Sequence, residues 1–306
     1  MPTTPVAHTM RFFDPNILRQ LENIELVARL LVEGMYASRH RSPYYGYSVE
    51  FVDYREYAPG DDPRLIDWKV VARTEKYFVK RFEMESNMNV TCLLDVSASM
   101  GYRSTDRNRL TKLEYANYLA ASLSYLVTRQ QDAPGLVTFG DDIQDFFPPR
   151  QGERHFYSLL SRLETLEATG ETDIAHVLEI IAQRLTRRGI IVLISDCYGD
   201  TKPVLDGIGH LRARGHDVIV FQLLDRDELT FPFSALTSFR DMETDVQVMT
   251  DPTRQRRIYL ERLDRFLDAL ASGCAACGAD YRRIDTTQPI ELVLREYLLY
   301  RRQQSR

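Results

Sequence analysis

The chain has 306 residues, of which 44% are hydrophobic and 27% are charged, as expected for a globular protein with room for a large domain and a smaller one. The net charge of −5 argues against nucleic acid as the principal partner. The sequence has no run of 18 apolar residues to span a membrane, and its start does not resemble a signal peptide. Four cysteines make no disulfide framework, so we expect a reduced, cytoplasmic protein.

Residues 1–43 predict a loose tail followed by one amphipathic helix. The pair Asp14-Pro15 is a typical helix start, because an aspartate caps the helix and proline suits its first position. Apolar residues then follow a helical stripe to about Met35. We expect this helix to precede the structured domains.

Residues 44–88 predict a small β-rich platform. A strand is expected near residues 47–52, dense turn chemistry lies at 58–63, and a second strand is expected from Tyr77 to Phe82. A short helix through Trp68 is expected between them. The large aromatic side chains of this segment are Tyr54, Tyr57 and Trp68. They either pack the platform onto the next domain or fill the platform's own core, and these two interpretations are equally well supported.

The stretch from Val90 to Leu94 is a short apolar run with the length and β-branched content of a strand buried on both faces. It is followed at once by Asp95, Ser97 and Ser99, so that every second residue carries an oxygen. Ligands of open α/β sheets collect where strands end, and oxygen ligands suit hard divalent cations. The alternative is a polar loop with ordinary capping serines.

The rest of the chain alternates between helix and strand patterns, which predicts an α/β fold with a doubly wound, mostly parallel sheet covered by helices on both faces. One antiparallel edge strand is expected, after the turn at 140–142. The expected helices cover 113–127, 156–166, 174–185, 203–214, 252–272 and 289–300, and the expected strands cover 135–139, 143–147, 190–194, 218–224 and 281–284.

Two further oxygen-bearing loops complete the pattern. Thr172 lies in a loop before a helix, and Asp196 follows the apolar strand at 190–194. If the strands are neighbours in a parallel sheet, their loops open on the same edge. Five side chains can then converge on one divalent ion, Mg²⁺ or else Mn²⁺ or Ca²⁺; they are Asp95, Ser97, Ser99, Thr172 and Asp196.

This constellation resembles the metal-ion-dependent adhesion site of von Willebrand factor A domains, whose motifs occur in the same order at similar intervals. The resemblance implies a von Willebrand A-like domain over residues 89–306, with Ser97 and Ser99 bound directly to the metal. Thr172 and Asp196 would bind it directly or through water, and Asp95 mainly through water.

The platform also resembles a bacterial family known as domain of unknown function fifty-eight, which joins such a platform to a von Willebrand A-like domain. Members are commonly encoded beside MoxR-class AAA+ ATPases, so the resemblance implies such an ATPase as a partner. The residues that carry it are Val49-Glu50-Phe51, Asp53-Tyr54-Arg55-Glu56-Tyr57, Pro59-Gly60-Asp61-Asp62-Pro63-Arg64, Ile66-Asp67-Trp68, Ala72-Arg73-Thr74 and Lys80-Arg81-Phe82-Glu83.

The function expected from these features is a non-catalytic, metal-dependent adaptor that binds an acidic side chain of a client protein or of the ATPase, in chaperone-like assembly or maturation. Hydroxyl ligands leave positive charge on the ion, which suits capture of a carboxylate. The alternatives are a metal-dependent hydrolase and a metal-free scaffold with a vestigial site. No histidine is placed to activate Ser97 or Ser99 as a nucleophile.

Two other candidates are given structural roles. Cys274 and Cys277 form a single CxxC without further ligands for structural zinc, so we expect them to pack between helices. His176 is expected to be a solvent-facing or capping residue of the helix after Thr172.

Overall fold

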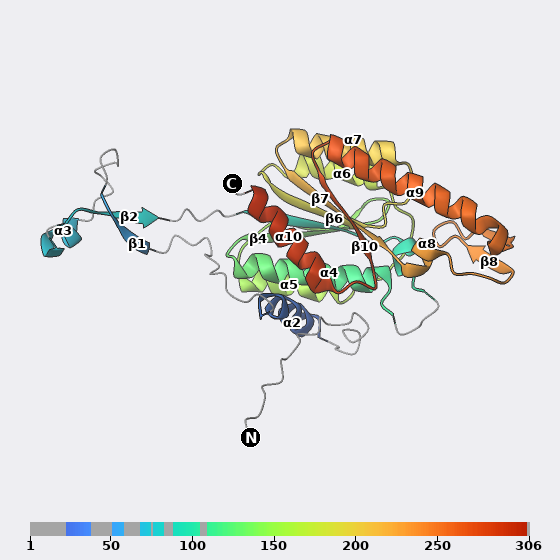
Figure 1. Cartoon of the computed structure of the whole chain (residues 1–306), viewed down its shortest axis with the longest axis horizontal. Coiled ribbons are helices and arrows are strands. Elements are labelled where there is room, and N and C mark those ends of the chain that lie inside the picture. Colours follow the sequence, from blue (N-terminus) through green and yellow to red (C-terminus); the bar gives the residue numbers. More distant parts are fainter. Residues whose placement is uncertain are drawn as a thin grey trace, which may run out of the picture.

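A computed structural model describes residues 23–37, 51–57, 68–74, 76–82, 88–104 and 109–304. A six-stranded sheet in the order β10-β7-β6-β3-β4-β5 forms its centre (Figure 1). All neighbouring strands are parallel except β4 and β5, which pair antiparallel. The strands are β3 (Asn89–Asp95), β4 (Ala133–Phe139), β5 (Ile143–Phe147), β6 (Gly189–Ser195), β7 (Asp217–Leu224) and β10 (Asp280–Asp285).

The inner strands are buried along almost their whole length. In β3, every residue after Asn89 is buried, and β6 and β7 show the same pattern after their first residue. A strand with helices on both faces has no exposed side, which explains the continuous apolar runs in the sequence.

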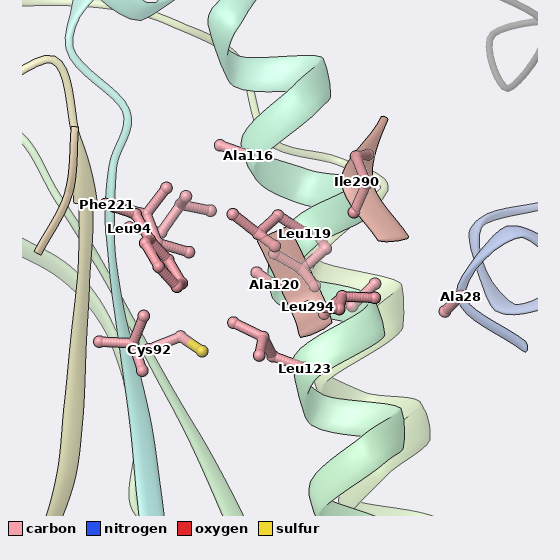
Figure 2. Packing of buried hydrophobic residues seen from close by; sticks show 14 of the residues in the cluster. Ala28, Cys92, Leu94, Ala116, Leu119, Ala120, Leu123, Phe221, Ile290 and Leu294 are labelled. Atoms are coloured by element: carbon pink, nitrogen blue, oxygen red, sulfur yellow. The ribbon is translucent and has the colours of Figure 1, made fainter. Parts of the chain in front are cut away.

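Helices cover both faces of the sheet and form a large hydrophobic core on each face. In the larger core, Cys92, Leu94 and Phe221 face Leu119 of α4 and its neighbours, with Leu294 of α10 close behind (Figure 2). The other face is covered by α6, α7 and α9. The helices of the domain are α4 (Lys112–Arg129), α5 (Glu153–Leu163), α6 (Ile174–Arg184), α7 (Thr201–Ala213), α8 (Arg226–Thr230), α9 (Pro252–Ala276) and α10 (Ile290–Gln304).

A glycine lies where α7 and α9 pack together. A Cβ atom at Gly273 would collide with the Leu205 side chain of α7, so a larger residue at this position requires that side chain to move. The CxxC residues lie in the same region. Cys274 is buried and Cys277 half-buried, both are free thiols, and the Cys277 thiol donates to the Leu205 carbonyl at 3.6 Å. This agrees with the packing role expected from the sequence.

The N-terminal helix belongs to the core of the large domain. Helix α2 (Ile24–Ala37) buries Val27, Ala28 and Leu31 in the same cluster as α4 and α10. Helix α2 matches the second half of the predicted helix, while the predicted start at Asp14-Pro15 lies outside the described residues. The division of the chain at residues 43 and 88 stays a prediction.

The platform contains an antiparallel pair, β1 (Phe51–Glu56) and β2 (Phe78–Phe82), with α3 (Trp68–Thr74) between them in sequence. The predicted strand near 47–52 therefore overlaps β1 only at its end, and residues 47–50 and the turn at 58–63 are outside the described part. Trp68 is 62% exposed and meets Tyr77, 54% exposed, edge to face with ring centroids 6.4 Å apart. For Trp68, neither of the two expected burial roles is realised.

The fold class predicted from the sequence is confirmed: an α/β, mostly parallel sheet with one antiparallel edge strand and helices on both faces. Three elements were not predicted, namely the 3₁₀ helix η2 (Ala98–Gly101), the short α8 and the hairpin of β8 (Thr237–Arg240) and β9 (Gln247–Thr250). No helix in the described ranges is long and apolar enough to cross a bilayer.

Candidate metal centre

The end of β3 is held in place by hydrogen bonds to Asp95. One carboxylate oxygen of Asp95 accepts from the backbone N–H of Ser97 at 2.9 Å, and the other accepts from the Ser195 hydroxyl, at the end of β6, at 2.6 Å. Asp95 and Ser97 are fully buried. Because β3 and β6 are adjacent and parallel, Asp95 ties the ends of both strands together.

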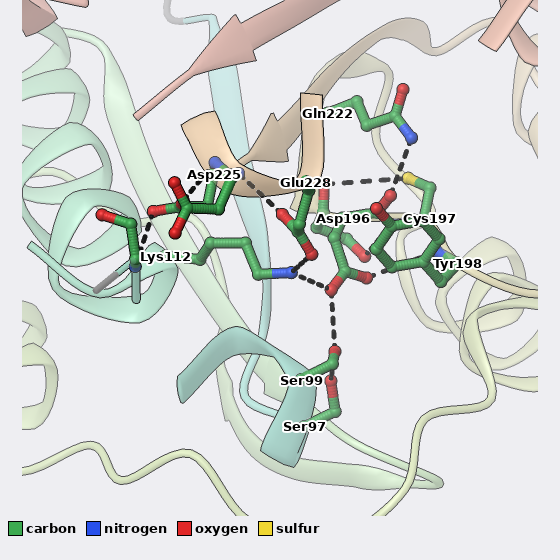
Figure 3. A network of polar contacts seen from close by, with 12 residues as sticks. Ser97, Ser99, Lys112, Asp196, Cys197, Tyr198, Gln222, Asp225 and Glu228 are labelled. Atoms are coloured by element: carbon green, nitrogen blue, oxygen red, sulfur yellow. Dashed lines mark hydrogen bonds and ion pairs between the residues drawn. The ribbon is translucent and has the colours of Figure 1, made fainter. Parts of the chain in front are cut away.

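A short chain of hydroxyls links this turn to Asp196. The Ser97 and Ser99 Oγ atoms lie 3.1 Å apart, and the Ser99 hydroxyl donates to Oδ2 of Asp196 at 2.8 Å (Figure 3). The helix η2 positions Ser99, because its backbone turns with Met100 N–H donating to the Ser97 carbonyl. Two hydroxyls and two carboxylates from different loops therefore converge, as the sequence predicted.

The loop that carries Thr172 is bonded to the same turn. The Ala98 N–H donates to the Gly170 carbonyl at 2.9 Å, and the Thr169 N–H donates to the Val96 carbonyl at 2.8 Å. On its other side the loop lies against Gly140, where a Cβ atom would be 2.9 Å from the Glu171 carbonyl oxygen. The Thr172 Oγ1 atom is buried and has no hydrogen-bond partner.

An ammonium group that was not predicted lies beside Asp196. The Lys112 Nζ atom donates to Asp196 Oδ2 at 2.7 Å and to Glu228 Oε1 at 2.9 Å, and Lys112 is only 1% exposed (Figure 3). Lys112 is the first residue of α4, and Glu228 belongs to the capping box that starts α8. The first turns of both helices therefore meet at the Lys112–Glu228 ion pair.

Burial and neighbouring charge set the pKa values of these groups. Burial, followed by the charge of Asp196, raises the pKa of Asp95 to about 7, against the effect of its hydrogen bonds from Ser195 and Ser97. Burial also raises the pKa of Glu228. Burial alone would lower the pKa of Lys112, but Asp196 and Glu228 raise it above its ordinary value.

The donor set suits a hard divalent cation. Lys112 pairs with the buried carboxylate of Asp196 and the half-buried one of Glu228, and the buried carboxyl group of Asp95 lies close by, so negative charge is in excess when all three are ionised. The unpartnered Thr172 hydroxyl supplies a further oxygen. Among the described residues no cluster of three or more His, Cys, Asp and Glu side chains has metal-binding geometry, so any site here depends on Ser and Thr hydroxyls.

The five predicted site residues thus lie on one edge of the sheet, four of them joined by hydrogen bonds and the fifth on a loop bonded to the same turn. Sequence reasoning missed Lys112, Glu228 and Ser195. A signal existed for Lys112, since a cation in the first turn of a helix opposes the helix dipole unless an anion lies nearby. His176 is exposed on α6, as expected.

A separate hollow lies at the opposite edge of the sheet. It has a volume of about 220 Å³ and is lined by residues at the starts of β3 and β6, together with Arg184, Thr186 and His216. None of the five predicted site residues lines it. The hollow is therefore distinct from the candidate metal centre at the carboxyl ends of β3 and β6.

Two similar proteins are each described as an uncharacterized protein. An uncharacterized protein of Mycobacterium tuberculosis is 26% identical over 238 residues, which is 76% of this chain and 73% of the relative. The uncharacterized protein YeaD of Bacillus subtilis is 28% identical over 109 residues, 36% of this chain and 24% of YeaD.

Solved structures similar to this chain include BatB from Bacteroides thetaiotaomicron, with a TM-score of 0.48 and 16% sequence identity. The similarity covers 70% of this chain and 98% of BatB. The VWA domain of SpRpn10 has a TM-score of 0.40 and 12% identity, covering 68% of this chain and 94% of that domain. The model of the family described as "Protein of unknown function DUF58" matches residues 53–265, and the chain belongs to this family.

Proposed function

We propose that the protein is a non-catalytic, divalent-metal-dependent adaptor that binds an acidic side chain of a partner protein. The observation that carries this proposal is the cluster of the Ser97 and Ser99 hydroxyls with Asp196, together with a buried, unpartnered Thr172 hydroxyl on a loop bonded to the same turn. Such groups would hold Mg²⁺ or Mn²⁺ directly or through water. A bound ion would supply positive charge to which a carboxylate of the partner binds.

The accessible side of the cluster supports binding from outside. Asp95, Ser97 and Asp196 are fully buried, whereas Ser99 and Thr172 are half-buried. A ligand of the site therefore approaches from the side of Ser99 and Thr172. The partner proposed from the family resemblance is a MoxR-class AAA+ ATPase or its client, in chaperone-like assembly or maturation.

The geometry gives little support to hydrolysis by an activated serine. The Ser99 hydroxyl donates to a carboxylate, not to a histidine. His155 bonds the Pro134 carbonyl and His216 the Leu185 carbonyl, both at the opposite edge of the sheet, and His176, in the first turn of α6, is exposed. A nucleophilic serine needs an adjacent base, so binding is the better supported activity.

A metal-free scaffold is the second candidate, and one observation favours it. The Lys112 ammonium already neutralises part of the charge of Asp196 at 2.7 Å. If this ion pair is the whole function of the cluster, the protein binds its partners without a divalent ion.

The two candidates are separated by a binding measurement between the full chain and a MoxR-class ATPase from the same organism. Ser99→Ala is compared with Ser158→Ala, which removes an exposed hydroxyl on α5. Magnesium is kept constant in all samples, because a chelator would also strip the ion from nucleotide on the ATPase. We expect Ser99→Ala alone to weaken binding; equal binding by both variants would contradict metal-dependent adhesion.

A further inference from the structure

The β8–β9 hairpin, residues 237–250, is fixed to the domain at its base. Phe239 stacks on Phe231 with ring centroids 5.4 Å apart, and Phe231 stacks on Tyr259 of α9 at 4.6 Å. The Tyr259 hydroxyl donates to the Glu228 carbonyl at 3.0 Å. The hairpin is therefore anchored to the same short helix, α8, whose Glu228 side chain binds Lys112.

The tip of the hairpin is an ordered turn. One carboxylate oxygen of Asp241 accepts from the backbone N–H groups of Glu243 and Thr244, at 2.9 and 3.0 Å. Arg240 and Asp245 form an ion pair at 2.7 Å across the turn. These bonds fix the direction in which the Glu243 side chain leaves the backbone.

That direction is toward the metal centre. Every residue from Arg240 to Met249 is exposed except Glu243, which is half-buried. Its neighbour Met242 reaches η2, because a Cβ atom at Gly101 would lie 3.5 Å from the Met242 Cε atom. Burial raises the pKa of Glu243, while hydrogen bonding to the hydroxyls of Ser99 and Ser97 lowers it.

A count of donors shows that Glu243 and Asp196 compete for the hydrogens of these two hydroxyls. Each hydroxyl has one hydrogen to donate. The Ser99 hydrogen goes to Asp196, so the 3.1 Å contact between the two hydroxyls uses the hydrogen of Ser97. The carboxylate of Glu243 therefore competes for hydrogens that these contacts already use, with the charge of Asp196 nearby. A cation among these oxygens removes the conflict.

We propose that Glu243 is the chain's own carboxylate ligand for the divalent ion, an inference that rests on the metal site proposed above. In this role Glu243 takes the position that a partner's acidic side chain would otherwise occupy. The Ser99 side of the cluster is the accessible one, and it is the side on which Glu243 lies. A partner carboxylate must therefore displace the tip of the hairpin before it can bind.

The experiment is a calorimetric titration of the full chain with Mn²⁺ alone, in a buffer without carboxylates. Glu243→Gln is compared with wild type and with Glu171→Gln, which removes the same charge from an exposed residue beside Thr172. We expect the Mn²⁺ affinity of Glu243→Gln to fall about 10-fold, and that of Glu171→Gln to change little. Excess acetate should restore affinity in Glu243→Gln and leave wild type unchanged.

The outcomes separate this assignment from the metal site itself. If wild type binds one Mn²⁺ and Glu243→Gln binds it equally well, Glu243 is not a ligand and the metal site stands. If wild type binds no Mn²⁺, both the site and the ligand assignment are wrong. Equal acetate effects on wild type and Glu243→Gln would also overturn the proposed competition.

Discussion

The Lys112 Nζ atom lies 2.7 Å from Asp196 Oδ2, and both side chains are buried, Lys112 at 1% exposure and Asp196 at 0%. A buried ion pair is costly to break, because removal of one partner leaves the other charge without solvent or a counter-ion. This pair lies inside the candidate metal centre. A substitution in the site that breaks this ion pair therefore changes the stability of the protein as well as any metal binding.

Replacement of the lysine should be strongly destabilising. We expect Lys112→Met to lower the free energy of unfolding by about 3–5 kcal/mol, because the buried carboxylate of Asp196 and the half-buried one of Glu228 lose their cation. Urea denaturation in the presence of a chelator measures this change. Arg257→Met is the control, since it breaks an exposed pair with Glu261 that contributes about 0–1 kcal/mol. A loss equal to that of the control would contradict the assigned role.

Thr172 distinguishes a metal ligand from a structural residue. Its Oγ1 atom is buried without a partner, so Thr172→Val should change the stability of the metal-free protein by less than about 1 kcal/mol. The same substitution should weaken Mg²⁺ or Mn²⁺ binding, measured by calorimetric titration. If affinity is unchanged, the hydroxyl does not bind the ion.

The raised pKa of Asp95 predicts a pH dependence of the metal-free protein. The pKa is about 7 in the folded chain and about 3.9 when unfolded. Between these values the folded state holds a proton that the unfolded state has released, so stability falls as pH rises, by up to about 1.4 kcal/mol per pH unit. Above about pH 7 Asp95 is ionised in both states, so it no longer makes the free energy of unfolding depend on pH.

Denaturation of wild type and Asp95→Asn in chelator, from pH 5 to pH 8, measures this effect. The asparagine of the variant cannot ionise, so the stability of wild type relative to the variant should decline over this range. If the stability of wild type and of Asp95→Asn depends on pH in the same way, the pKa of Asp95 is not raised in the folded protein.

Asp196→Ala, an obvious variant for partner binding, is a poor choice for this protein. It removes one of the two carboxylates that neutralise Lys112, so a loss of binding could follow from loss of structure. Ser99→Ala removes a half-buried hydroxyl and should cost only about 1 kcal/mol of stability. We expect it to retain the circular dichroism spectrum and melting behaviour of the fold and to lose metal binding.

Local sequence patterns predicted most of the sheet and the place of Asp95 and Asp196 at the carboxyl ends of two neighbouring strands. The apolar runs of β3 and β6 mark strands buried on both faces, and Asp95 and Asp196 follow directly at their ends. Parallel pairing of these neighbouring strands then brings both residues to one edge. Each step depends on residues close together in the sequence.

The missed features depend on contacts between distant segments. Lys112 is separated from Asp196 by 84 positions in the sequence and from Glu228 by 116. The residues next to the lysine in the sequence do not indicate which carboxylates it contacts. The β8–β9 hairpin has strands of only four residues, held by the aromatic contacts of Phe231 and Phe239. Strands this short give too few alternating positions for their period to show.

The most direct test of the central claim is an anomalous diffraction measurement on crystals of the full chain grown with Mn²⁺. We predict a single strong anomalous peak on the sheet edge, among the oxygens of Ser97, Ser99, Thr172 and Asp196. Crystals that contain ordered side chains at this edge but no peak there, at a Mn²⁺ concentration that saturates the titration, would contradict it.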